Sequence, residues 1–233
     1  MKVIIPLLFL LASGCSITCI HPTSPVEERT LDVASFTGIE VGGAAQVTVE
    51  KGDIQQVKVT AQPEVIALLE TKVDGGVWDI STSKCWTSDK GLTIHITTPA
   101  ALTSVEVSGS ADVELGNVFS TDKTELSTSG SGSISAAEIN AKALKVDISG
   151  SGTITVRGTC TNMEAAISGS GDLHTVDLAA NAVDVDIAGS GKADVKAITT
   201  LEASVSGSGE VRYSGKPDLR SSISGSGSVM PLP

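Results

Sequence analysis

The sequence predicts an all-β protein built around a parallel β-helix, a β-solenoid with about 18–21 residues in each coil. Three observations support this prediction. A Gly-Ser signature recurs seven times in the C-terminal part of the chain, aliphatic residues keep fixed places beside each copy, and short alternating segments precede the repeat. Aromatic residues make up only 3% of the 233 residues, so the core must be narrow and built from Val, Ile, Leu and Ala.

Residues 1–14, MKVIIPLLFLLASG, predict a signal peptide, because the apolar stretch after Lys2 is too short to span a bilayer. The segment LASGC resembles a bacterial lipobox, in which the cysteine, here Cys15, is diacylated and becomes the mature N-terminus. We therefore expect a lipoprotein anchored to the membrane through Cys15. Because Ser16 follows rather than Asp, we expect the outer membrane, with its periplasmic or surface face left open. Ordinary secretory cleavage, with Cys15 removed or left free, is the alternative.

Residues 15–29 are polar, contain two prolines and show no periodicity, which predicts a tether. Residues 30–103 form an N-terminal β-rich part. Period-two alternation predicts strands at 46–50, 56–60, 77–81 and 92–97, separated by glycine-containing turns at 51–53, 74–76 and 89–91. One short helix is expected at 64–70, started by Pro63.

Residues 104–233 carry the repeat, with the copies VSGSADV, TSGSGSI, ISGSGTI, ISGSGDL, IAGSGKA, VSGSGEV and ISGSGSV. Their first glycines are Gly109, Gly130, Gly150, Gly169, Gly189, Gly207 and Gly225. We expect one coil for each copy. The residue before the motif and the second residue after it are apolar in nearly every copy, so stacking at about 4.8 Å per coil would turn these positions into ladders inside the β-helix.

The signature has three chemical interpretations that the sequence does not favour. Phosphate-binding loops require a helix after the glycines, and calcium-binding nonapeptide repeats require stacked aspartates. A serine nucleophile would be needed once, beside a base, rather than in every coil. Glycine inside a strand costs about 0.5–1 kcal/mol relative to alanine, so its recurrence predicts a corner that excludes a side chain. Ala111 and Ala188 mark the second glycine and the first serine as the more permissive positions.

Three segments together resemble the auto-transporter adhesin head domain, or GIN domain, family of exported bacterial proteins. They are FTGIEVGGAAQVTVEKG at 36–52, ITTPAALTSVEVSGSADVEL at 96–115 and SGSGEVRYSGKPDLRSSISGSGSV at 206–229. The resemblance covers roughly residues 30–230. It implies a right-handed parallel β-helix and a role in adhesion, and it carries over no catalytic or ligand-binding residue.

Charge and composition exclude several partners. The chain has 16 Lys and Arg against 27 Asp and Glu, a net charge of −11, so nucleic acid is not an expected partner. The three histidines are dispersed and the cysteines lack C-x-x-C spacing, so we expect no metal and no other cofactor. Cys85 and Cys160 could pair in an oxidising compartment, but buried free thiols are the expected state of Cys19, Cys85 and Cys160.

We therefore expect a non-enzymatic, adhesin-like binding module of the cell envelope whose ligand is a surface, a glycan or a protein; its oligomeric state stays open. A purely structural envelope protein is one alternative, and a polysaccharide lyase or hydrolase is another. The enzyme would require three or more carboxylates to converge in a groove from the candidates Asp172, Asp184, Asp186, Lys192 and Asp194. We expect Trp78 and Trp86 in the core, whereas two exposed coplanar rings would favour a sugar platform.

Overall fold

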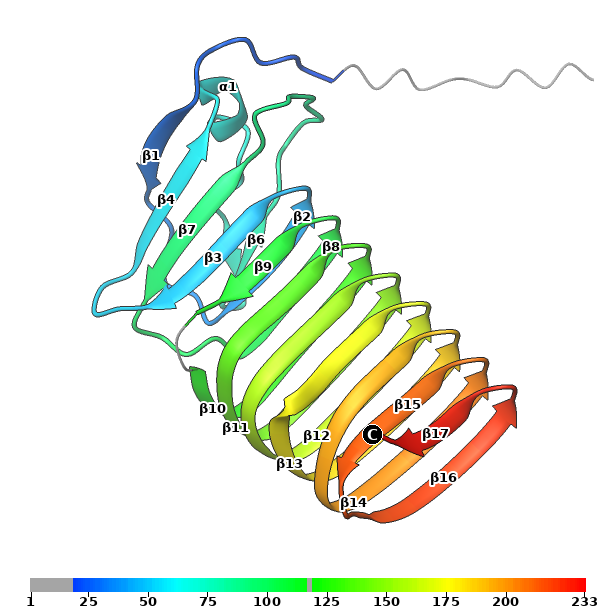
Figure 1. Ribbon diagram of the computed structural model, residues 1–233. Helices are drawn as coiled ribbons and strands as arrows, with labels where there is room; N and C mark the ends of the chain where they lie inside the picture. The colour runs from blue at the N-terminus through cyan, green and yellow to red at the C-terminus, as the bar shows by residue number, and fades with distance from the viewer. Residues whose placement is uncertain (1–18, 117–118) are drawn as a thin grey trace, which may run out of the picture.

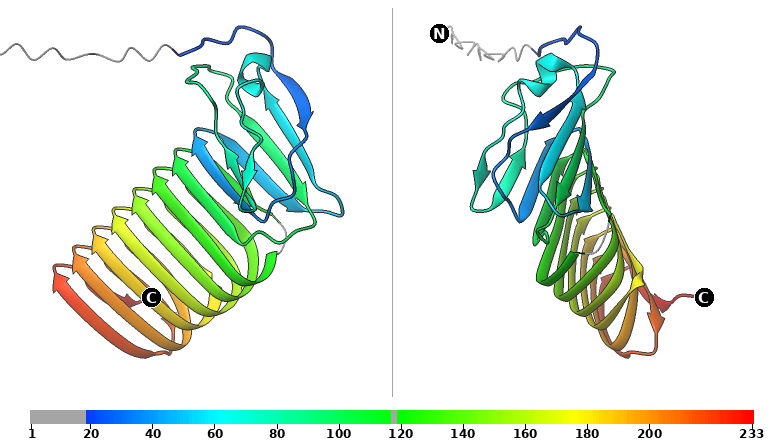
Figure 2. Two further views of the ribbon diagram at one scale, coloured as in Figure 1. Left: turned by 180° about the vertical axis from the view of Figure 1, so that it is seen from behind. Right: turned by 90° about the vertical axis from the view of Figure 1, so that its left-hand side faces the viewer.

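The computed structural model describes residues 19–116 and 119–233 of the chain, and it confirms a nearly all-β solenoid (Figure 1). Its strands join in a single sheet that winds into stacked coils. Figure 2 shows that the sharp corners of the coils lie along one edge of the stack, while an N-terminal lobe covers the first coil. No helix in the described ranges is long and apolar enough to cross a membrane.

The coils are built from parallel strands that pair in register with the strands of the coil before. The first two coils contain β2 (Gly38–Gly43), β3 (Gln46–Lys51), β8 (Ser104–Gly109) and β9 (Asp112–Leu115). The middle coils contain β10 (Phe119–Gly130), β11 (Ser133–Gly150), β12 (Thr153–Gly169), β13 (Asp172–Gly189) and β14 (Lys192–Gly207). The last coil contains β15 (Glu210–Gly215), β16 (Asp218–Gly225) and β17 (Ser228–Pro231).

The N-terminal lobe contains β1 (Glu27–Leu31), β4 (Gln56–Ala61), α1 (Pro63–Ile66), β5 (Val73–Asp74), β6 (Val77–Ile80) and β7 (Thr93–Thr98). Here β6 and β7 continue the parallel stack beyond β2 and β3, and β4 then pairs antiparallel with β7 and with β1. The four strands expected from period-two alternation are confirmed. The helix is shorter than expected, because the Leu69–Thr82 bridge returns the chain to β pairing.

The first glycine of each signature lies at the sharp corner of its coil, with φ between +112° and +143° across the seven copies. At Gly150 an added Cβ would lie 2.7 Å from the carbonyl oxygen of Gly130 in the coil before. That oxygen accepts a hydrogen bond of 2.8 Å from the backbone amide of Ser151. A side chain at this position would therefore enter the space that the corner's own hydrogen bond occupies.

The solenoid begins one coil earlier than the repeat in the sequence indicates. Gly43 pairs in register with Gly109, so the segment VGGAAQV at 41–47 occupies the same place as VSGSADV. Glycine or alanine replaces both serines of this copy, and the inserted lobe separates it from the next one. The solenoid therefore starts at Gly38 rather than at residue 104.

The aliphatic ladders lie inside the coils, as predicted. The ladder before the corner contains Ile148, Ile167 and Ile187, each at most 2% exposed, and the ladder after it contains Ile154 and Leu173, both fully buried. Burying each such side chain contributes roughly 1.5–3 kcal/mol. Thr128 occupies the ladder before the corner and is also buried.

The segment expected to be a tether is a strap over the lobe from Cys19 onward. Ile20 pairs with Trp86, the Ser24 hydroxyl donates to the Glu64 carboxylate at 2.7 Å, and β1 begins at Glu27. Alternating hydrophobicity is absent there because backbone and polar side-chain contacts hold the strap. Residues 15–18 lie outside the described residues.

Cys19 and Cys85 form a disulfide, so the expectation that both are free thiols is wrong, as is the alternative Cys85–Cys160 pair. The physical reason is the short pairing beside them, in which the Ile20 amide donates to the Cys85 carbonyl at 3.0 Å. Cys160 is a buried free thiol, as expected, and burial raises its pKa to about 11. At neutral pH it is therefore a protonated core residue without nucleophilic character.

The tryptophans belong to the lobe's core. Trp78 is completely buried, its ring centroid lies 5.6 Å from that of Phe36, and its indole nitrogen donates to the Glu70 carbonyl at 3.0 Å. Trp86 is half-buried and packs against the same core. These two rings do not form an exposed platform for a sugar.

Candidate functional site

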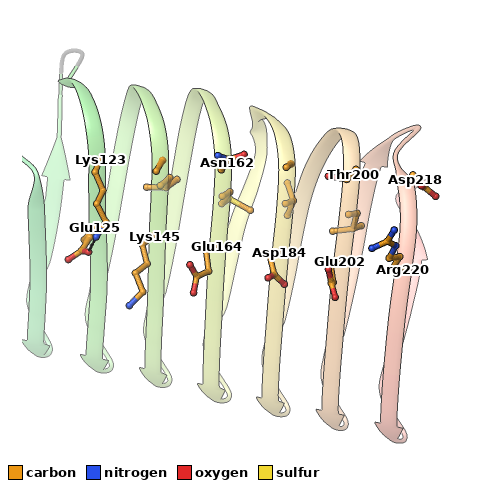
Figure 3. A pocket seen from close by; sticks show the side chains of 16 residues that line it. Lys123, Glu125, Lys145, Asn162, Glu164, Asp184, Thr200, Glu202, Asp218 and Arg220 are labelled. Carbon is orange, nitrogen blue, oxygen red and sulfur yellow. Dashed lines mark ion pairs between the residues drawn. The ribbon is translucent and has the colours of Figure 1, made fainter.

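A groove of about 670 Å³ runs along the solenoid axis and crosses the strands from β10 to β16 (Figure 3). Its residues form three ladders because each strand passes the groove once and pairs in register with the next. The floor ladder consists of Leu144, Met163, Val183 and Leu201. One rim consists of Lys123, Ala143, Asn162, Ala182, Thr200 and Asp218. The other rim consists of Glu125, Lys145, Glu164, Asp184, Glu202 and Arg220.

The floor of the groove is formed by an aliphatic ladder of its own. Each of its residues stands four positions before the residue of the same coil in the ladder before the corner. Its members are between 1% and 3% exposed because their side chains point into the coil, and the small side chains of Ala143 and Ala182 on one rim leave room above the backbone of this ladder. The groove therefore lies between two rims, over the backbone of this ladder, and its length follows from the number of stacked coils.

The middle of the charged rim is negative. Glu164 pairs in register with Asp184, and Asp184 with Glu202, so the three residues stand on neighbouring strands about 4.8 Å apart. None of the three forms an ion pair within the described residues. Burial raises the pKa of Asp184, and the charges of Asp186, Glu202 and Glu164 raise it further.

Basic side chains flank the three carboxylates on this rim, Lys145 beside Glu164 and Arg220 beside Glu202. Lys145 binds Asp147 at 2.8 Å, and Lys123 binds Glu125 at 2.5 Å. Arg220 stands in the last coil, directly opposite Glu202, and forms no ion pair with it within the described residues. Like charges directly opposite each other destabilise neighbouring strands, so a positively charged group placed against Glu164, Asp184 and Glu202 would be favoured.

The carboxylates proposed for an enzyme do not converge. Only Asp184 lines the groove; Asp186 lines a smaller hollow nearer the corner. Asp172 and Lys192 begin the strands beyond the corner, and Asp194 is bound to Arg212 there. In the described part of the chain, no group of three His, Cys, Asp or Glu side chains is placed to hold a metal ion.

Asp194 belongs to a structural ladder with His174 and Arg212 in adjacent coils. Arg212 donates to both carboxylate oxygens, at 2.6 and 2.5 Å, and His174 Nδ1 lies 3.4 Å away. Burial pushes the pKa of Asp194 upward, but Arg212 and His174 more than offset this, and the pKa lies below its usual value. The cluster therefore holds strands together and does not supply a proton.

Glu164, Glu202 and Arg220 were not singled out from the sequence, although a signal for them exists. In the last six copies, a charged residue always stands three positions before the member of the ladder before the corner. These residues are Glu125, Lys145, Glu164, Asp184, Glu202 and Arg220. The motif serines, in contrast, lie on the exposed corner with the seven glycines. The lipidation residue Cys15 lies outside the described residues.

Comparisons with known proteins agree with this architecture. A family model described as "Putative auto-transporter adhesin, head GIN domain" matches residues 35–217. A search of curated proteins found no match.

Solved structures with the same fold come from Bacteroides and Parabacteroides. A putative adhesin from Bacteroides fragilis NCTC 9343 is 24% identical, with a TM-score of 0.85 over 91% of this chain and 100% of that chain. A putative lipid binding protein from Parabacteroides distasonis ATCC 8503 is 24% identical, with a TM-score of 0.78 over 93% and 100%. A putative adhesin from the same organism is 24% identical, with a TM-score of 0.76 over 92% and 100%.

Proposed function

This chain belongs to the auto-transporter adhesin head GIN domain family, and from that membership and the groove we propose that it is a non-enzymatic binding module of the cell envelope. The groove is the observation that carries the proposal. It combines a long hollow with three adjacent carboxylates that form no ion pair within the described residues, on a rigid stack of strands. Ligand sites are concave and mostly apolar, with a few polar groups that fix orientation.

The ligand class follows from the shape and charge of the groove. An extended chain that carries amino groups along a carbon backbone would lie between the two rims, with its apolar parts against Ala143 and Ala182. Its amines would reach Glu164, Asp184 and Glu202 on the rim. The similar Parabacteroides protein is named a putative lipid binding protein, but an anionic lipid head group would meet like charge on this rim. The charge therefore favours the amino-bearing ligand.

An array of glycans, matrix proteins and fatty acids, probed with the chain from Ser16 onward, tests this function. We expect amino-bearing ligands to bind. The triple variant Glu164→Gln, Asp184→Asn, Glu202→Gln should bind them at least tenfold more weakly, which equals about 1.4 kcal/mol. Binding should also weaken as the pH falls toward the pKa of Asp184, which burial and the neighbouring carboxylates raise above its usual value.

The matched control removes three negative charges from the strands that follow the corner glycines. Its substitutions are Glu114→Gln, Asp172→Asn and Glu210→Gln. This control should bind like the unaltered chain. Equal losses in both triple variants would contradict a site in the groove, and complete silence of the array would favour a purely structural role. Cleavage of a bound polysaccharide would contradict the non-enzymatic function.

We also propose that acylated Cys15 tethers the module to the outer membrane. The support is the lipobox-like segment LASGC and the place where the described chain enters the fold, at Cys19 on the lobe (Figure 1). The solenoid would then point away from the membrane. Labelling of growing cells with a fatty acid should mark the chain, whereas a Cys15→Ala variant should stay unlabelled. Equal labelling of both would contradict the anchor.

A further inference from the structure

The two ends of the solenoid differ in how they are covered. At the N-terminal end, β6 and β7 stack on the first coil, and β4 and β1 extend the sheet beyond β7. At the other end, β16 pairs with β14 alone and β17 with β15 alone within the described residues. The last coil therefore presents one unpaired edge of each strand (Figure 2).

The last coil also exposes the continuation of the core ladders. Leu219 and Ile223 are 37% and 45% exposed, whereas their partners in the preceding coil, Leu201 and Val205, are 1% and 2% exposed. An exposed strand edge normally carries protective lysines or prolines. The eight residues of β16, DLRSSISG, contain neither, and all eight are exposed.

We propose that two copies of this chain associate end to end, with β16 paired antiparallel to β16 of the partner subunit about a two-fold axis at Ser221. Side chains alternate along a strand, so Leu219, Ser221 and Ile223 all face the inside of the coil. This register places Leu219 opposite Ile223 of the partner subunit and Ser221 opposite Ser221 of the partner subunit. Both aliphatic ladders then continue across the junction.

The sequence of β16 explains why a second copy fits this edge. Leu219 and Ile223 are equidistant from Ser221, so one register satisfies both subunits, as a two-fold interface requires. On the outward side, Arg220 would face Ser222 of the partner subunit, and Asp218 would face Ser224 of the partner subunit. No like charges are directly opposed.

The covered lobe limits the assembly to a dimer. Head-to-tail stacking would pair β16 with β1, the outermost strand of the lobe, whose charged sequence EERTL does not continue the aliphatic ladders. Only the two C-terminal ends match, and the association closes. Because Asp218 and Arg220 line the end of the groove, the two grooves would open on the same face of the dimer, on opposite sides of the two-fold axis.

Light scattering after size exclusion, over a range of concentrations up to about 100 μM, tests the pairing with the chain from Ser16 onward, which contains every described residue. We expect a mass twice that of the monomer, falling to the monomer on dilution. Ile223→Lys should give the monomer at every concentration, with an unchanged circular dichroism spectrum. The matched control Ile198→Lys, at an isoleucine that is 50% exposed on the side of the solenoid, should remain dimeric.

Cross-linking tests the register. Residues directly opposite in an antiparallel pair have Cα atoms about 4.5–5.5 Å apart, within disulfide range. Ser221→Cys copies should therefore form a disulfide-linked dimer under mild oxidation, while Ser208→Cys copies, at the exposed corner of the preceding coil, should not. A monomeric chain at every concentration, a dimeric Ile223→Lys variant, or equal cross-linking at both cysteines would each overturn the proposal.

Discussion

A Gly150→Val substitution should destabilise the fold by more than about 3 kcal/mol, as expected for strain at a special φ combined with a backbone clash. The residue has φ +112°, and its added Cβ would lie 2.7 Å from the Gly130 carbonyl oxygen. This contact is with backbone, so no rotation of a side chain can relieve it. The clash would also displace the acceptor of the Ser151 amide, and the corner would lose a hydrogen bond.

The matched control is the neighbouring Ser149→Ala. Ser149 is exposed, and the equivalent position in a later coil is Ala188, so its unfolding midpoint should change little. Urea unfolding followed by circular dichroism measures both variants. Equal, small effects of the two substitutions would show that the corner does not depend on glycine.

Removing the Cys19–Cys85 disulfide should have the second-largest effect, a loss of about 2–4 kcal/mol. The bridge closes a loop between residues 66 positions apart and holds the strap against the lobe. Cys85→Ser should lower the unfolding midpoint, and a reductant should lower that of the unaltered chain by a similar amount.

Cys160→Ala provides the control for this prediction. Cys160 is a buried free thiol in β12, so its variant should keep the full sensitivity to reductant. The Cys85→Ser variant should show none. A midpoint of the unaltered chain that does not respond to reductant would contradict a stabilising bridge.

Most of the solenoid could be predicted because parallel stacking makes the copies of the signature equivalent. Intervals of 18–21 residues define the coils, and comparing the copies identifies the inward positions, such as Ile148 and Ile154. The internal exceptions are only partly informative. Ala111 replaces a glycine that does not need positive φ, but the second glycines of later coils also exclude a side chain, since an added Cβ at Gly171 would lie 2.7 Å from the Gly152 carbonyl oxygen.

The remaining features depend on contacts between segments that show no shared pattern. The Cys19–Cys85 bridge follows from the pairing of Ile20 with Trp86, and neither segment shows periodicity. The coil at Gly43 was missed because alanine and glycine replace its serines. The groove was missed because the shape of the coil, rather than the order of residues, determines which outward ladder lies in a hollow.

The most direct test of the groove is the methyl spectrum of the methionines during a titration with spermine, a linear polyamine, at physiological ionic strength. From Ser16 onward the chain contains two methionines: Met163 on the groove floor and Met230 in the last coil. A ligand in the groove should shift the Met163 signal and leave Met230 unchanged, and the shift should disappear in the Glu164→Gln, Asp184→Asn, Glu202→Gln variant. An unmoved Met163 signal, or the same shift in that variant, would contradict the groove as the binding site.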